Sequence, residues 1–265
     1  MFTQPQDFQE QNQDLYDLIK GLDDKDLAQE TRFKSWTLNR ILGHLHMWNW
    51  AAAQSLEGEE VFAKFANDFM AELKTGSMAT YEAKWLDDLQ GTELLRTWWS
   101  FSQSLVESYA SADPKARVKW MGPDMSIRSS VTARIMETWS HGQAVFDLMG
   151  VERRDRDSIK NIAVLGLNTF GWTYMNRKLV VPDQRPSVHL VAPSGENWDW
   201  PNPESDNAIK GSATEFCQVV TQTRNIADTS LEVRGAVAQE WMATAQCFAG
   251  PVETPPAPGD RRKEV

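Results

Sequence analysis

The chain has 265 residues and a formal net charge of −10, with 27 Lys and Arg against 37 Asp and Glu. Such an acidic chain is not expected to bind the phosphate backbone of a nucleic acid. No apolar run approaches the roughly 18 residues of a membrane span, and the first residues lack the pattern of a signal peptide. We therefore expect a cytoplasmic protein with neither nucleic-acid nor membrane partners. Cys217 and Cys247 do not form a CxxC pair, which indicates buried free thiols.

Apolar residues recur at helical spacing in four segments of the first half, with no strand-like alternation between them. Gly150 follows the fourth segment, where a glycine that ends a helix belongs. The predicted helices cover residues 8–19, residues 37–56, about 20 residues from Thr92 to before Asp113, and residues 126–149. The first half is therefore predicted to be a helical bundle.

The pattern changes after the charged segment 152–157, which predicts a connection between two domains. Alternating and helical patterns then follow one another, as in an α+β domain. The predicted order is a helix over 159–176, strands over 187–192 and 197–200, a helix over 213–223, a strand over 230–234 and a helix over 236–248. The proline-rich end is predicted to be disordered. The domains are thus expected at 1–154 and 155–250, with a tail at 251–265.

Glu137 and His141 are four residues apart on a predicted helix, so both side chains project from one face. His44, on the second predicted helix, is the best candidate for a third ligand of a divalent metal ion. Two histidines and one carboxylate leave a metal position open for water or substrate, as in catalytic sites. By spacing alone, a surface ion pair or a buried structural histidine remains an alternative.

Several stretches of the chain resemble the DinB-like superfamily, in particular the branch of mycothiol-dependent maleylpyruvate isomerase and its uncharacterised metal-binding relatives. Two later stretches are similar to the sterol-carrier-like C-terminal domain of that branch. The stretches of the first kind are residues 36–48, the segment WMGPDMS at 120–126 and the segment ARIMETWSHGQAVFD at 133–147, and those of the second kind are residues 191–200 and 216–224. The resemblance extends to about residue 251.

This resemblance implies an α+β chain with an N-terminal DinB-like, up-down four-helix bundle and a smaller α+β sterol-carrier-like C-terminal domain. It also implies a divalent metal site, usually zinc, with one His from an early helix and a Glu and a His from a late one. The matching positions are His44, Glu137 and His141. His46 is a poor substitute, because two residues along a helix point about 200° away from each other.

Two further residues are candidate catalytic residues, Gln143 because it lies on the same predicted helix as two of the ligands and Arg224 because of the resemblance. Gln143 could orient a ligand or the substrate, and Arg224 could bind a substrate carboxylate, as an arginine in the second domain of the isomerase does. Trp48, Trp120 and Trp172 could wall an apolar pocket. The segment at 120–126 belongs to the uncharacterised relatives, so maleylpyruvate itself is not carried over as the substrate.

The leading hypothesis is a metal-dependent transferase or isomerase that uses a metal-bound thiolate on a small electrophile. The thiol would be of low molecular weight, such as mycothiol or glutathione, and the metal zinc by default. One alternative is a metal-dependent hydrolase, lyase or rearrangement enzyme that uses no thiol. Another is a binding protein that holds a metal and an apolar ligand without turnover. A monomer or a homodimer is expected.

Overall fold

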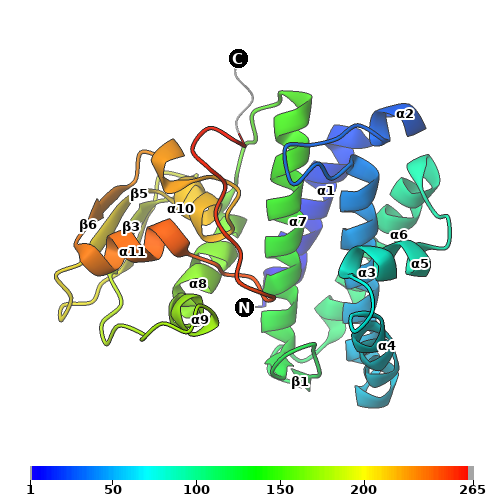
Figure 1. Ribbon diagram of the computed structural model, residues 1–265, viewed down its shortest axis with the longest axis horizontal. Coiled ribbons are helices and arrows are strands. Elements are labelled where there is room, and N and C mark those ends of the chain that lie inside the picture. The colour runs from blue at the N-terminus through cyan, green and yellow to red at the C-terminus, as the bar shows by residue number, and fades with distance from the viewer. Residues whose placement is uncertain (1, 262–265) are drawn as a thin grey trace. The chain divides into compact units, whose positions relative to one another are not determined.

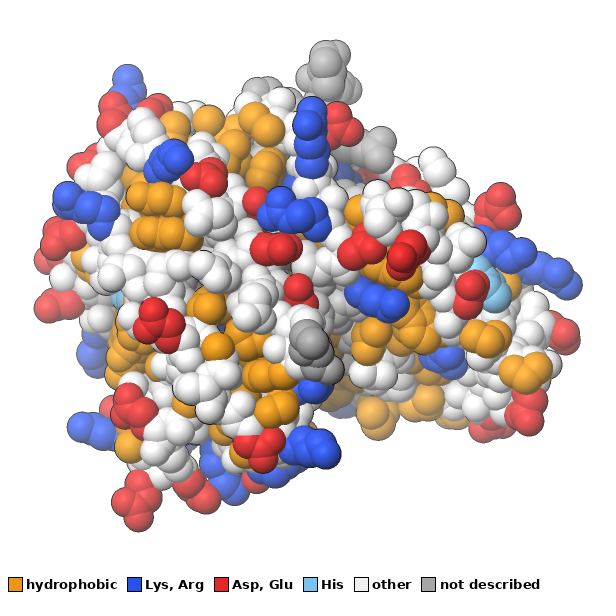
Figure 2. Space-filling model, turned by 180° about the vertical axis from the view of Figure 1, so that it is seen from behind, with side chains coloured by type: hydrophobic (Ala, Val, Ile, Leu, Met, Phe, Trp, Pro, Cys, Tyr) orange, Lys and Arg blue, Asp and Glu red, His pale blue; other side chains and the backbone are white. Residues whose placement is uncertain are grey.

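The computed structural model describes residues 2–261, which form two compact units. The division falls between Val145 and Phe146, inside helix α7 (Ile127–Met149), whereas the sequence placed the domain boundary in the charged connection after this helix. No helix in the described range is both long enough and apolar enough to cross a membrane. Acidic and basic side chains are mixed over the face shown in Figure 2.

The first unit is helical, as predicted. Long helices pack side by side, with α3 against α6 and α6 against α1. Hydrogen bonds join α7 to two of these helices: Thr138 donates to Asn12 of α1, and Tyr109 of α6 bonds with Ser130. Figure 1 shows α7 beside α1 and α3. The elements are α1 (Gln4–Ile19), α2 (Asp24–Leu27), α3 (Leu38–Glu57), α4 (Glu59–Glu72), α5 (Met78–Leu86), α6 (Gly91–Ser111), β1 (Arg117–Val118), β2 (Met125–Ser126) and α7.

Helices α4 and α5 lie in a stretch for which the sequence analysis proposed no element. Phe62, Phe65 and Phe69 recur on one face of α4, and all three are buried in a cluster with Met47 and Ala51 of α3. Burial of these rings favours α4 by removing large apolar surfaces from water. Helix α5 begins after Ser77, whose hydroxyl accepts a hydrogen bond from the Thr80 backbone amide.

The second unit is α+β, as predicted. Its four-stranded sheet has the order β4-β3-β5-β6, in which β3 is antiparallel to β4 and parallel to β5. Helix α10 packs on β3 and β5. The elements are η1 (Asp157–Ile159), α8 (Lys160–Asn168), α9 (Phe170–Asn176), β3 (Ser187–Val191), β4 (Asn197–Trp200), β5 (Ala208–Ser212), α10 (Ala213–Val220), η2 (Ile226–Asp228), β6 (Glu232–Arg234) and α11 (Ala236–Thr244).

Several details of the second unit differ from the predictions, and helices α10 and α11 end three and four residues earlier than predicted. The predicted helix over 159–176 is interrupted at Thr169, whose hydroxyl donates to the carbonyls of Leu165 and Gly166 and so competes with the helical backbone pattern. Strand β5 was not predicted, because Lys210 and Gly211 break the apolar alternation around its buried Ile209. Cys217 and Cys247 are buried thiols, as expected.

Part of the segment that the sequence predicts as a disordered tail is hydrogen-bonded to the rest of the second unit. Arg177 and Gln222 donate hydrogen bonds to the carbonyl of Glu253, and Asn225 donates to the carbonyl of Pro256, which is itself buried. Side chains of the second unit thus donate hydrogen bonds to backbone carbonyl groups of a segment that has no regular secondary structure. Residues 262–265 of the predicted tail lie outside the described residues.

Candidate metal centre

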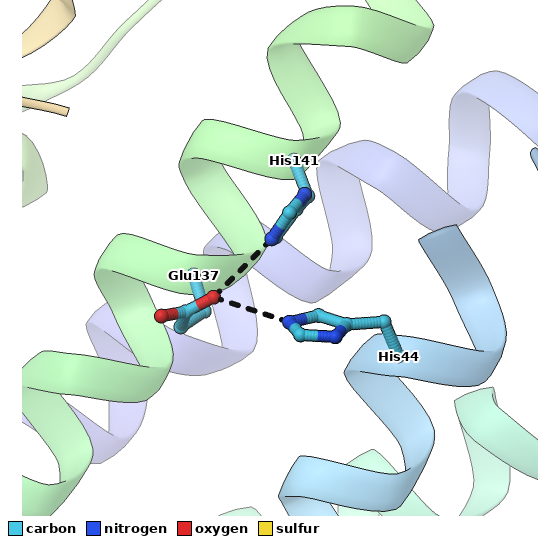
Figure 3. A group of neighbouring side chains, drawn as sticks. All are labelled: His44, Glu137 and His141. Carbon is cyan, nitrogen blue, oxygen red and sulfur yellow. Dashed lines mark ion pairs between the residues drawn. The ribbon is translucent and has the colours of Figure 1, made fainter. Parts of the chain in front are cut away.

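Two helices of the first unit supply the predicted ligands. Helix α3 begins after Thr37, whose side chain accepts a hydrogen bond from the backbone amide of Arg40. His44 lies in its buried middle section, and Glu137 and His141 lie one turn apart on α7. The three side chains point toward one another (Figure 3). The structure therefore brings together the three residues that the sequence predicted as ligands.

The carboxylate of Glu137 lies between the two imidazoles. Glu137 Oε2 is 3.3 Å from His141 Nε2 and 3.5 Å from His44 Nε2. One potential donor atom from each residue can be chosen so that all three lie within 4.8 Å of one another. The donor atoms thus converge on one small region.

These residues fit a divalent transition-metal ion. Imidazole nitrogens and a carboxylate oxygen are common zinc ligands, with bond lengths of about 2.0–2.2 Å. Two ligands of a tetrahedral ion at such distances lie about 3.3 Å apart. The separations of 3.3 and 3.5 Å agree with this value. Three protein ligands would leave one position for an exogenous group, the arrangement typical of catalytic zinc.

Glu82 of α5 belongs to the same cluster, although it was not among the residues predicted from the sequence. Its Oε1 lies 2.6 Å from Nδ1 of His44, and both side chains are buried. Because an ionised carboxylate only accepts hydrogen bonds, Nδ1 carries the hydrogen and Nε2 faces Glu137. A carboxylate behind a histidine ligand in this way fixes the tautomer and the ring orientation.

The charges of the cluster explain the directions of its pKa shifts. Burial opposes ionisation of Glu137, yet hydrogen bonds with His141 and His44 and the nearby charge of Arg134 hold the pKa of its carboxyl well below the usual value. Burial also opposes the charged form of His44, but Glu137 and Glu82 raise its pKa above the usual value. For His141, burial prevails and lowers the pKa. An anionic carboxylate thus sits beside two imidazoles of different basicity.

Aromatic rings enclose the two histidines. The ring of Trp36 stacks on His141 with a centroid distance of 5.5 Å, and Phe33 meets His141 edge-on at 5.1 Å. Trp48 lies 6.3 Å from His44 and 5.8 Å from Trp120, measured between ring centroids. Trp48 and Trp120 were expected as pocket walls, and Phe33 and Trp36 add to them. Trp172, the third predicted wall residue, belongs to the second unit, where it donates to the carbonyl of Phe248.

Of the two candidate catalytic residues, Arg224 forms an ion pair with another side chain. Its guanidinium binds both carboxylate oxygens of Asp147, at 2.8 and 2.6 Å, and both residues belong to the second unit. Gln143 is buried on α7, two residues beyond His141, so the two side chains point about 200° apart around the helix. The substrate-orienting roles of Arg224 and Gln143 remain predictions.

The other two histidines lie outside the cluster. His46 is buried among aromatic rings, 5.4 Å from Trp85 and 5.5 Å from Phe101 between centroids. Its Nδ1 has no hydrogen-bond partner among residues 2–261. His189 lies on β3 and pairs with Asp199 at 2.7 Å. Both residues thus lie apart from the three candidate ligands.

Comparison with known proteins adds independent information. A family model described as the mycothiol maleylpyruvate isomerase N-terminal domain matches residues 8–146. Two uncharacterised proteins from two strains of Mycobacterium tuberculosis are each 32% identical over 252 residues, which cover 92% of this chain and 95% of theirs. The crystal structure of mycothiol-dependent maleylpyruvate isomerase matches with a TM-score of 0.50 and 12% identity, over 82% of this chain and 86% of the isomerase. At that identity the structural likeness concerns the fold alone.

Proposed function

The chain belongs to the family of the mycothiol maleylpyruvate isomerase N-terminal domain, and from this membership and the geometry of the cluster we propose that it is a divalent-metal-dependent enzyme. Its reaction would join a low-molecular-weight thiol, such as mycothiol or glutathione, to a small electrophile, in a transfer or an isomerisation. The observation that carries the proposal is the convergence of His44, Glu137 and His141 within 4.8 Å. These residues would hold the metal, with zinc as the default.

When bound, a divalent cation lowers the pKa of a thiol or water molecule that it coordinates, so that the anion is available at neutral pH. Glu137 supplies a negative charge to the cation because its carboxyl stays ionised. Glu82 holds His44 with Nε2 directed to the site. The rings of Trp36 and Trp48 exclude water from one side of the histidines and offer an apolar surface to the electrophile.

The thiol chemistry can be written as a balanced sequence. The thiolate sulfur attacks the β-carbon of a double bond conjugated to a carbonyl group, and the electron pair of that double bond moves to the carbonyl oxygen. Rotation about the resulting single bond, return of the electron pair and cleavage of the carbon–sulfur bond give the isomerised product and regenerate the thiolate. If the α-carbon instead takes the proton that the thiol released, the adduct persists and the reaction is a transfer.

The first test is the metal content of the purified chain and of two variants. Roughly one metal ion per chain is expected in the wild type, and most of it should be lost in both Glu137→Ala and His141→Ala. The matched control is His189→Ala, which removes an imidazole outside the cluster and should keep the metal. Full metal retention in Glu137→Ala and His141→Ala would refute the metal site.

The second test asks which chemistry the metal-loaded protein performs. A small electrophile with a conjugated cis double bond is incubated with mycothiol or glutathione, and thiol and product are followed separately. Thiol consumption supports transfer, whereas isomerisation without thiol consumption supports an isomerase. Turnover without added thiol would favour a metal-dependent hydrolase or lyase. A metal-loaded protein that turns over no electrophile would point to a binding protein, and Glu137→Ala provides the inactive control.

A further inference from the structure

Arg134 is a buried cation next to the candidate metal centre that the proposed chemistry does not use. It lies on α7 three residues before Glu137, so the two side chains share one face of the helix about one turn apart. The side chain is only 4% exposed, and its Nη1 has no hydrogen-bond partner among the described residues. A guanidinium group buried in this state is costly unless an anion compensates it.

The nearest acidic residue on the helix cannot serve Arg134 alone. Oε2 of Glu137 is shared by His44 and His141, and Glu137 is also the residue that would bind the metal. Tyr109 also lies near Arg134, but it carries no charge at neutral pH because burial raises its pKa to about 12, and its hydroxyl bonds with Ser130. Neither of these two neighbours therefore provides Arg134 with a counter-ion of its own.

The balance of formal charge becomes positive once a metal is in place. A divalent cation and Arg134 bring three positive charges, against one negative charge each from Glu137 and Glu82, while metal-bound histidines are neutral. One positive charge is left over in a buried region of low dielectric constant. The metal-bound thiolate of the proposed reaction would neutralise this charge, but it would leave Nη1 of Arg134 without an acceptor, which a carboxylate of the same small molecule could supply.

The surroundings of Arg134 also indicate the character of that anion. The guanidinium carbon lies 5.8 Å from the ring centroid of Trp120. The ring of Trp120 contacts that of Trp48, which in turn contacts the imidazole of His44. An apolar wall thus runs from the cation to the metal ligands. A small organic molecule with one carboxylate suits this combination, because the carboxylate matches the planar donor fork of an arginine.

We propose that Arg134 binds a carboxylate of the small molecule that reacts at the His44, Glu137 and His141 cluster. This inference rests on the proposed metal-dependent function, because the carboxylate would belong to a molecule that reacts at the bound cation. It assigns the substrate, or the thiol that reacts with it, to the class of monoanionic carboxylates. Arg134 would bind and position this group and would take no part in bond making.

The inference can be tested with the cobalt-loaded protein, since a thiolate that coordinates Co²⁺ gives a near-ultraviolet charge-transfer band. The two probes are 3-mercaptopropionate and 3-mercaptopropionamide, which differ in charge but hardly in size. The wild type is expected to bind the acid about 10 to 100 times more tightly than the amide, the range for a charge-assisted hydrogen bond. Arg134→Gln should bring this ratio close to one.

Arg40→Gln is the matched control, because Arg40 is an exposed arginine that packs on Trp36 at 4.1 Å, close to the same cluster. Its acid-to-amide ratio should equal that of the wild type. If Arg134→Gln does not fold, Arg134→Lys takes its place: it keeps the charge but loses the planar fork, and the ratio should fall at least about three-fold.

The outcomes separate the two proposals. Cobalt and thiolate binding with the same ratio in wild type and Arg134 variants would overturn the carboxylate site and leave the metal centre intact. A chain that binds no cobalt would overturn the metal centre, and this inference with it. An acid-to-amide affinity ratio that falls in the Arg134 variants but not in Arg40→Gln supports both the metal centre and the carboxylate site.

Discussion

Oε1 of Glu82 lies 2.6 Å from Nδ1 of His44, and this contact links a short helix that binds no metal itself to the ligand set. Helix α5 thus contributes to the site through a hydrogen bond with Nδ1 of His44, the ring nitrogen that faces away from Glu137. The hydrogen bond restrains both rotation of the ring and the position of its proton.

We therefore expect Glu82→Ala to weaken metal binding about 10- to 100-fold, the usual effect of removing such a partner. Glu82→Gln, which keeps an acceptor but loses the charge, should lie between wild type and Ala. Competition with a chromophoric chelator measures the affinity, and the nitrogen chemical shifts of His44 show whether Nδ1 still carries the proton. Glu60→Gln, at an exposed position of α4, is the control. Equal affinities of Glu82→Ala and wild type would exclude the orienting role.

His46 should make the stability of the protein depend on pH. Burial lowers the pKa of His46 to about 4, whereas the unfolded chain has a value near 6.5, so the unfolded state takes up a proton first as the pH falls. This contribution to stability is fully present above pH 6.5 and is lost between pH 6.5 and about 4, by up to about 3 kcal/mol. Urea unfolding of His46→Phe at pH 7 and pH 4.5 should show a smaller difference than the wild type. A difference between pH 7 and pH 4.5 in His46→Phe as large as that of the wild type would exclude this role of His46.

The ion pair between Asp147 and Arg224 should contribute to the stability of the second unit. Both side chains are largely removed from water, so Asp147→Asn leaves a guanidinium without its charge partner, at a cost of about 3 kcal/mol. The double variant Asp147→Asn, Arg224→Met should lose less than the sum of the single changes. Chemical denaturation of all four proteins measures this coupling. Asp17→Asn, which breaks an exposed ion pair with Lys20, should have little effect. Additive losses would show that the pair is not coupled.

The segment after residue 251 should stabilise the second unit. A chain that ends at residue 251 loses the carbonyls of Glu253 and Pro256, which accept hydrogen bonds from Arg177, Gln222 and Asn225. Leaving these buried or half-buried donors unpaired should lower the melting temperature and speed proteolysis of the second unit. A chain that ends at residue 261 keeps every one of these contacts and is the control. Identical melting of the two truncated chains would favour the disordered tail that the sequence suggested.

The helices with a regular apolar stripe and the three ligand candidates could be predicted from the sequence. His44, Glu137 and His141 could be named as candidates because the chain has only four histidines, because two of the residues are four apart on a helix and because the resemblance places ligands at these positions. It did not reveal that residues 78, 81, 82 and 85 form the inward side of a helix, because α5 has only nine residues. A carboxylate among apolar positions, as at Glu82, is a signal of a buried polar partner that could have been used.

Other features depend on contacts between distant parts of the chain. No local pattern shows that Arg224 would find Asp147, 77 residues earlier, or that side chains near residue 222 would hold a proline-rich segment. Local composition describes such a segment as disordered because it lacks the apolar residues of a core. Its order comes from hydrogen-bond donors elsewhere in the second unit, which only the folded structure reveals.

The four histidines occupy four different environments: one is backed by a carboxylate, one is stacked on Trp36, one is enclosed by apolar rings and one is paired with Asp199 on a strand. Their eight ring nitrogens should consequently give four well separated sets of signals in a nuclear magnetic resonance spectrum. Two of these sets would respond to a ligand at the cluster, and the other two would serve as internal references within the same molecule. Because the chain has only four imidazoles, ligand binding at the cluster could be followed from the histidine nitrogen signals, with nitrogen-15 as the only label.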